Sequence, residues 1–93
     1  MKDFDWNEEK NKQLKEERGV CFEDVQNSIV ERGALDIIPH PNKDKYPDQK
    51  LYIVYIAGYV YMVPFVEDGE KQFLKTIIPS RKLKKLYKDK IKE

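Results

Sequence analysis

The most constraining feature of the sequence is a run of sixteen uncharged residues, Leu51 to Val66. β-Branched and aromatic residues fill both halves of this run, and Ala57 with Gly58 divides it. Two such segments joined by a two-residue turn predict a β-hairpin. In the first half, apolar side chains fall on both faces of the strand, so the sheet is expected to be covered on each side or paired with another chain. The run is too short and, with four tyrosines and a proline, too polar to span a membrane.

Shorter β-like segments flank the hairpin. Ala34 to Ile38 predicts one strand, and Gln72 to Ile78 predicts another after a turn at Glu67 to Glu70. His40 to Lys50 is rich in proline, asparagine and aspartate, which indicates an exposed loop. Pro64 predicts a bulge or an edge position late in the second hairpin strand, because proline cannot donate to a ladder.

Two helices are predicted in the first third of the chain. Asn7 to Arg18 contains good helix formers, begins with a capping asparagine and is followed by Gly19. A second pattern follows Cys21 as N-cap and ends at Gly33, with Asp24 placed to complete a capping box. Its apolar face contains Phe22, Val25 and Ile29.

The last helix is predicted from Arg81 to roughly Lys92, after the capping residue Ser80. Its apolar stripe consists of Leu83, Leu86, Tyr87 and Ile91. The element order is therefore α-α-β-β-β-β-α, an α+β fold in which helices pack on a four-stranded antiparallel meander. Ninety-three residues supply one hydrophobic core, so residues 1–93 are expected to form a single domain.

The formal net charge of +1 conceals an uneven distribution. Residues 1–33 contain six basic and nine acidic side chains, residues 34–79 contain five and six, and residues 80–93 contain seven and two. A basic terminal helix can be a solvated face, a phosphate-binding patch or a docking surface for an acidic partner. Composition alone leaves these three readings open.

Several classes of chemistry are disfavoured by what the sequence lacks. A single cysteine, Cys21, excludes an internal disulfide and a four-cysteine zinc site, and it is better explained as a small residue at a helix start than as a reactive thiolate. The one histidine, His40, lies between prolines and is expected at the surface. Glycine-rich phosphate loops and serine-nucleophile motifs do not occur, so no cofactor or metal is expected. No apolar leader follows Met1, which favours a cytoplasmic location.

Basic groups beside a tyrosine-bearing sheet can bind RNA. Lysine and arginine neutralise phosphates, and aromatic rings stack on unpaired bases. Cationic side chains can also stabilise the charge that develops at phosphorus during cleavage, without a metal. Tyrosines in strands more often pack the sheet, and that plainer role is expected for most of Tyr52, Tyr55, Tyr59 and Tyr61.

Three segments, Phe4 to Lys10, Gly19 to Val25 and Ile77 to Lys82, follow one another in the order of a known family pattern. The pattern comprises a Phe-x-Trp opening, a His-Gly-Val-Ser-Phe-Glu segment and an Ile-Ser-Ala-Arg-Lys-like junction. Together the segments resemble the BrnT family of bacterial type II toxin–antitoxin toxins over nearly the whole chain. In this sequence, Arg18 stands where the family usually has histidine and Cys21 where it has serine. The middle strands also lack the arginine often found there.

The resemblance implies a RelE-like fold and a metal-independent endoribonuclease that arrests translation, independently of ribosomes or weakly linked to them. It also implies a small cognate antitoxin of the BrnA type with a ribbon-helix-helix-like region. A dimer or a hetero-oligomer with the antitoxin is compatible with this reading, and membrane association is not expected.

By position, Lys10 matches the early lysine of the family, and Arg81 with Lys82 matches the basic pair at the junction. Arg18 can keep only a charge role, because it replaces the histidine that would transfer a proton. Tyr55, Tyr61 or Glu23 is then the candidate proton handler. The expected catalytic residues are Arg81, Lys75 and Lys10, and the expected RNA-binding residues are Lys82, Arg18, Lys85, Tyr55 and Tyr61.

Two other functions stay open. The missing family histidine favours a binding module without catalysis, in which an antitoxin-like peptide covers the sheet face or adds to a sheet edge. Direct DNA binding by the last helix is less favoured, because no helix-turn-helix spacing is present to aim it.

Overall fold

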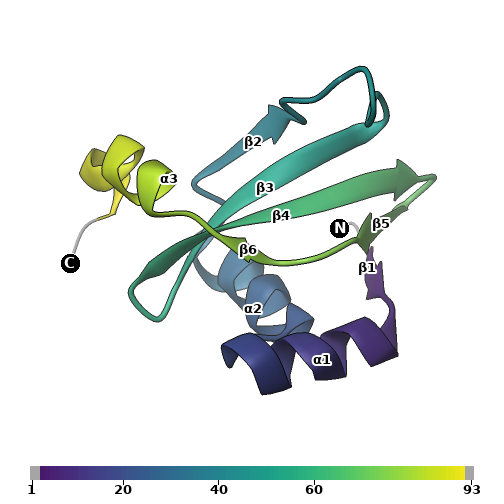
Figure 1. Ribbon diagram of the computed structural model, residues 1–93, viewed down its shortest axis with the longest axis horizontal. Coiled ribbons are helices and arrows are strands. Elements are labelled where there is room, and N and C mark those ends of the chain that lie inside the picture. The colour runs from purple at the N-terminus through teal and green to yellow at the C-terminus, as the bar shows by residue number, and fades with distance from the viewer. Residues whose placement is uncertain (1–2, 92–93) are drawn as a thin grey trace.

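The computed structural model describes residues 3–91, which form a mixed six-stranded sheet with helices on both faces (Figure 1). In this part of the chain, no helix is long and apolar enough to cross a membrane. The strand order is β1-β5-β4-β3-β2, with β6 also paired to β4. The elements are β1 (Asp3–Trp6), α1 (Glu8–Arg18), α2 (Phe22–Arg32), β2 (Asp36–Pro39), β3 (Gln49–Ile56), β4 (Tyr59–Asp68), β5 (Lys71–Leu74), β6 (Ile78–Pro79), α3 (Arg81–Leu86) and the 3₁₀ turn η1 (Lys88–Lys90).

The central hairpin is formed by β3 and β4, as predicted. Their register pairs Tyr55 with Val60, and the strands are joined at Ala57 and Gly58. Both turn residues have positive φ, 50° and 87°, which is the backbone hand that fits the twist of paired strands. The two strands occupy the middle of the sheet, so the most apolar segment of the chain lies in its interior.

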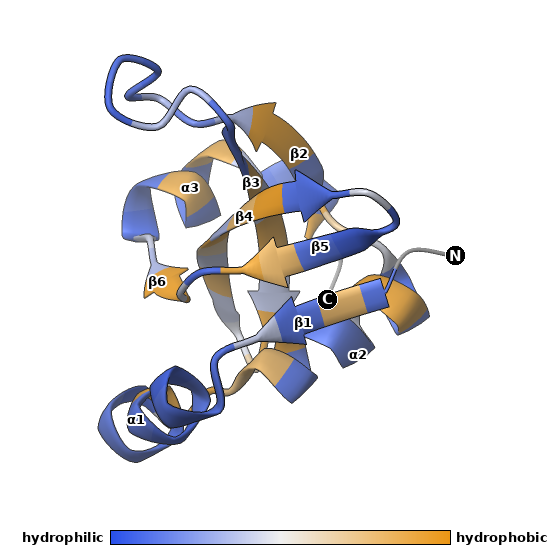
Figure 2. Ribbon diagram, turned by 90° about the vertical axis from the view of Figure 1, so that its right-hand side faces the viewer, coloured by the Kyte–Doolittle hydropathy of each residue, from blue (hydrophilic) through white to orange (hydrophobic). Residues whose placement is uncertain are grey.

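Both faces of the sheet are covered, which confirms that part of the prediction. On one face, α1 and α2 pack Leu14, Phe22 and Val25 against strand residues such as Val54. On the other face, the α3–η1 segment covers a smaller cluster. That cluster contains Leu51, Ile53 and Val60 of the sheet and Leu83, Tyr87 and Ile91 of the C-terminal segment. The helix α1 contributes a narrow apolar stripe, and most of its surface is hydrophilic (Figure 2).

The first two helices begin and end as predicted. The Asn7 side chain accepts a hydrogen bond from the Lys10 amide at 3.0 Å, and Gly19 adopts the left-handed conformation after α1. The buried Asn11 joins the helices, because its amide group donates to Glu23 at 2.6 Å and its oxygen accepts from the Phe22 amide at 2.7 Å. The start of α2 is thus fixed on α1 by a satisfied buried polar group.

The predicted four-stranded antiparallel meander is wrong in two respects. Asp3–Trp6 forms an additional strand, β1, which pairs with β5 in parallel and makes the sheet mixed. The predicted strand Gln72–Ile78 divides into β5 and β6, which pair with different parts of β4.

Pro64 explains where that strand divides. It is buried in the central strand β4 and its pairing with β3 is continuous, so neither the predicted edge position nor a bulge against β3 is found. Its carbonyl accepts from the Lys75 amide at 2.7 Å. In an antiparallel ladder the backbone nitrogen and the carbonyl oxygen of one residue point to the same neighbouring strand. The nitrogen of Pro64, which carries no hydrogen, therefore also points to the segment between β5 and β6. A regular strand opposite Pro64 would leave one acceptor without a donor.

The last helix is shorter than predicted. Ser80 caps it as expected, accepting from the Leu83 amide at 3.2 Å. The α-helix ends at Leu86, and the Lys90 amide donates to the Tyr87 carbonyl at 3.0 Å in a tighter 3₁₀ turn. Closely spaced lysines repel one another on a short helix, which favours this early end. The predicted terminus at Lys92 lies outside the described residues.

The outer edge of β2 offers no free backbone donor along its described length. The His40 amide donates to Gln49 of β3 at 3.1 Å, so the amides of the alternate positions, Ile37 and Pro39, face outward. The Ile37 amide donates instead to the Asp36 carboxylate at 2.9 Å, and proline has no N–H. Addition of another strand here is therefore disfavoured.

Side chains also occupy backbone groups at the other exposed strand positions. At β1, the Trp6 amide donates to the Asp5 carboxylate at 2.9 Å. Just before β6, the Arg18 guanidinium donates to the carbonyl oxygen of Ile77. Several of the groups that an incoming strand would use are thus already engaged.

Candidate nucleic-acid interface

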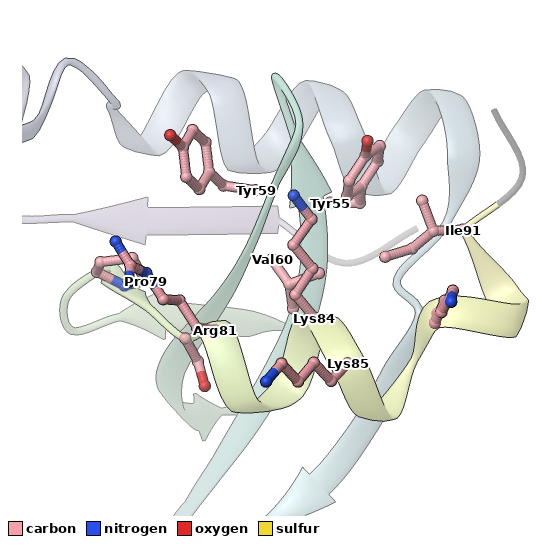
Figure 3. Close-up of a pocket in the computed structure, with 10 residues that line it drawn as sticks. Tyr55, Tyr59, Val60, Pro79, Arg81, Lys84, Lys85 and Ile91 are labelled. Carbon is pink, nitrogen blue, oxygen red and sulfur yellow. The ribbon is translucent and has the colours of Figure 1, made fainter.

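A groove of about 970 Å³ lies between α3 and the turn end of the β3–β4 hairpin. Figure 3 shows basic side chains of α3 on one side of the groove and the tyrosines Tyr55 and Tyr59 on the other. Val60 and Pro79 also line the groove. The lining residues are Tyr55, Tyr59, Val60, Pro79, Ser80, Arg81, Lys84, Lys85, Lys88 and Ile91.

Helical spacing places the basic side chains on the groove. Arg81, Lys84 and Lys85 recur at i, i+3 and i+4 on one face of α3, and Lys88 begins η1 just beyond it. The adjacent stripe, beginning with Leu83, packs on the sheet and fixes that face toward the hairpin turn. Among the described residues, no acidic side chain lines the groove. The groove therefore presents uncompensated positive charge, as a site for a polyanion does.

The tyrosines add flat surfaces beside this charge. Tyr59 is 56% exposed, and the Lys84 Nζ lies 5.5 Å from the centre of its ring. Tyr55 is half-buried and lines the groove from the other strand of the hairpin. A nucleic-acid base can stack on such a ring while a neighbouring cation binds its phosphate. Duplex nucleic acid hides these base faces, so the combination suits a single strand.

Three of the predicted site residues, Arg81, Lys85 and Tyr55, come together in this groove. Lys82 lies on α3 but not among the lining residues. Sequence reasoning missed Tyr59, Lys84 and Lys88 as members of the same site. Two sequence patterns could have indicated two of them. Lys84 shares a face of α3 with Arg81 and Lys85, and Tyr59 lies on the other side of the hairpin turn from Tyr55.

The other two predicted catalytic residues lie elsewhere. Lys10 is in the first turn of α1, which packs on the opposite face of the sheet from α3. Lys75 follows β5, and its Nζ lies 5.0 Å from the centre of the Phe73 ring. The structure places neither lysine among the groove residues with Arg81.

Arg18 and Tyr61 lie close together on the face that carries α1 and α2. Tyr61 is 8% exposed, and burial raises the pKa of its phenol, opposed by the positive charge of Arg18. The rings of Tyr61 and Tyr59 are 6.4 Å apart, so Tyr61 supports the groove tyrosine from the side. Arg18 is engaged with the Ile77 carbonyl. Neither residue is among those that line the groove.

Glu23, Cys21 and His40 do not line the groove, whereas the candidate proton handler Tyr55 does. The hydrogen bond from Asn11 lowers the pKa of Glu23, which favours its ionised form. Burial raises the pKa of Cys21, whose Sγ donates to Asp24 at 3.2 Å, so the thiol form is favoured. His40 packs against Tyr46 in the loop before β3, with 4.5 Å between the ring centres and 40° between the ring planes. In the described part of the chain, no cluster of three metal-ligating side chains occurs.

No known protein family, curated protein or solved structure matches the chain. The resemblance to BrnT toxins therefore stays an expectation from the three sequence segments. The groove itself is defined by its own residues and does not depend on that resemblance.

A polar contact holds the C-terminal segment, and with it one wall of the groove, against β2. The Tyr87 hydroxyl donates to the Asp36 carboxylate at 2.8 Å, and Lys90 Nζ approaches the Leu35 carbonyl at 3.4 Å. The bond from Tyr87 lowers the pKa of Asp36, whereas burial and then this same bond raise the pKa of Tyr87. Asp36 therefore prefers its ionised form in the folded protein.

The substitution Tyr87→Phe tests this contact through pH. Because the folded pKa of Asp36 lies below its ordinary value of 3.8, the contact stabilises fully above that pH and is lost as pH falls through the folded value. We expect the variant to lose about 0.5–1 kcal/mol of unfolding free energy at neutral pH, and the difference to shrink as pH falls below 3.8. Urea unfolding at several pH values measures this, with Tyr59→Phe as the control. A difference that does not change with pH would contradict the assignment.

Proposed function

We propose that the chain is the toxin of a bacterial type II toxin–antitoxin system, that it binds single-stranded RNA in the groove beside α3, and that it cleaves this RNA without a metal. The observation that carries the proposal is the groove itself, where four basic side chains face two tyrosines. Phosphate neutralisation and base stacking are the two interactions that sequence-tolerant binding of single strands requires. Arg81 and its neighbours would also stabilise charge at the reacting phosphate.

We propose a RelE-like fold for this chain. Two N-terminal helices cover one face of the sheet, and the chain then forms successive antiparallel pairs from β2 to β5 before reaching α3. The Pro-Ser-Arg junction, at which the sequence resemblance is found, leads directly into the groove wall.

Induced expression and an RNA assay test the proposal together. The wild-type chain is expected to arrest growth and to cleave RNA equally well with and without a chelator. Arg81→Ala is expected to lower cleavage by on the order of 100-fold, since loss of one group that stabilises transition-state charge has this effect. Lys12→Ala, an exposed change on α1, is the matched control. Unchanged cleavage and growth arrest with Arg81→Ala would refute the role of Arg81.

A non-catalytic binding module is the second candidate. It is favoured by the absence, among the described groove residues, of a histidine or carboxylate that could take a proton from the ribose hydroxyl. In this case the wild type arrests growth or binds RNA tightly while the RNA stays intact, with or without ribosomes. The proposed partner of either form is a small BrnA-type antitoxin. Its acidic side chains would suit the groove, whereas addition to the β2 edge is disfavoured by the engaged amide of Ile37.

A further inference from the structure

Tyr55 lines the groove and also two further hollows. One, of about 280 Å³, shares Tyr55 and Ile91 with the groove and adds Arg32 and Lys90 to the lining. The other, of about 290 Å³, shares Tyr55 and extends beneath the hairpin turn along α2. Tyr55 therefore borders the groove and both hollows, and Ile91 borders the groove and the first of them.

Charge distinguishes the two hollows. Of the described residues, Asp24 and Glu31 line the hollow under the hairpin turn, whereas the hollow toward Ile91 has no acidic lining residue. The hollow under the hairpin turn thus combines two carboxylates with Arg32, whereas the charged side chains lining the hollow toward Ile91, Arg32 and Lys90, are all cationic. These charges favour the hollow toward Ile91 for a polyanion that extends beyond Tyr55.

Arg32 is the cation best placed in the hollow toward Ile91. It occupies the last turn of α2, is exposed, and lines both hollows beside Tyr55. Lys90 is already engaged, because its Nζ lies 3.4 Å from the Leu35 carbonyl and 5.5 Å from the centre of the Tyr87 ring. Arginine also offers a planar set of donors that matches a phosphate.

We propose that the groove and the Arg32 hollow form one continuous track for single-stranded RNA, in which the strand passes Tyr55 and a phosphate beyond it is bound by Arg32. The track rests on the proposed binding of RNA in the groove. It adds a second binding region on α2, an element far from α3 in the sequence. A short oligonucleotide fills the groove alone, and a longer one reaches Arg32.

The test compares two lengths of oligonucleotide with the full chain. Fluorescence anisotropy is measured with a trinucleotide and an octanucleotide of unstructured RNA, for the wild type and for Arg32→Gln. We expect Arg32→Gln to weaken octanucleotide binding about tenfold, to lower its salt slope by about 0.7, and to leave trinucleotide binding unchanged. Arg32→Lys is expected to restore most of the affinity, and Lys12→Gln is the control on α1.

Each alternative outcome is informative. An equal effect of Arg32→Gln on both lengths, or no effect on either, overturns the track while leaving RNA binding in the groove intact. Wild-type protein that binds neither oligonucleotide refutes the proposed function and the track with it. An acidic peptide that binds more tightly than the octanucleotide, with the same dependence on Arg32, would assign the path to a protein partner and overturn the RNA track.

Discussion

Replacing both Lys84 and Lys85 by glutamate is expected to weaken the binding of single-stranded RNA by roughly 100-fold or more and to abolish growth arrest. Both lysines line the groove, and Lys84 also lies over the ring of Tyr59. A charge-assisted contact to phosphate contributes about 1.5–3 kcal/mol, and each 1.4 kcal/mol is tenfold in affinity. Reversal of the charge adds repulsion to the loss of two contacts.

The salt dependence separates this effect from general charge. Lys43→Glu with Lys45→Glu makes the same change in net charge at the opposite end of β3 from Tyr55, in an exposed loop. This control is expected to change affinity only a few-fold at low salt, and not at all near 0.2 M salt, because distant charges are screened. If the two double variants weakened binding equally, the groove would not be the binding site.

Replacing Phe22 by alanine is expected to cost about 3–5 kcal/mol of unfolding free energy, a large part of the stability of a small domain. Phe22 is fully buried, and its ring stacks on Trp6 with 5.7 Å between the ring centres. Its backbone amide donates a hydrogen bond to the side-chain oxygen of Asn11. Truncation leaves a cavity where β1, α1 and α2 meet. Thermal unfolding followed by circular dichroism should show a midpoint lower by on the order of 15 °C or more.

Val30→Ala is the matched change in the same helix. Val30 is 66% exposed, so its truncation is expected to alter the unfolding free energy by no more than about 0.5 kcal/mol. If Phe22→Ala lowered stability by less than about 1 kcal/mol, the packing of α2 on the sheet would be wrong.

The parts of the fold that follow from local signals were predictable from the sequence. The caps Asn7 and Gly19, the positive-φ turn at Gly58 and the capping serine at Ser80 each act on a few neighbouring residues. Periodicity then located the helices and the hairpin. Covering of both sheet faces also followed, because the side chains of β3 are apolar on each side.

Features that depend on distant parts of the chain were not predictable. β1 alternates charged and aromatic residues over only four positions, and it is a strand because β5 lies beside it. The division between β5 and β6 is set by Pro64, which lies across the sheet and not in the segment that divides.

The same distinction holds for the candidate site. Arg81 and Lys85 belong to one helix, so their common position could be inferred from spacing. Lys10 was grouped with them through the family resemblance and Lys75 as a further cation at the phosphate. In the structure, α1 packs on the far face of the sheet and the Lys75 Nζ lies over the Phe73 ring. No sequence pattern could show that Arg32 lies beside Tyr55, since α2 reaches the hairpin only through tertiary packing.

The engaged backbone groups at the sheet edges bear on how this protein behaves at high concentration. Its segment with the strongest tendency to form amyloid-like contacts, β3 with β4, is enclosed between other strands, and the outer strand β2 presents the bonded amide of Ile37 followed by Pro39. Stacking of a second chain on the β2 edge is thus disfavoured. Self-association into fibres through this edge should begin only after β2 has detached, so the rate of fibre formation would report the local opening of that strand.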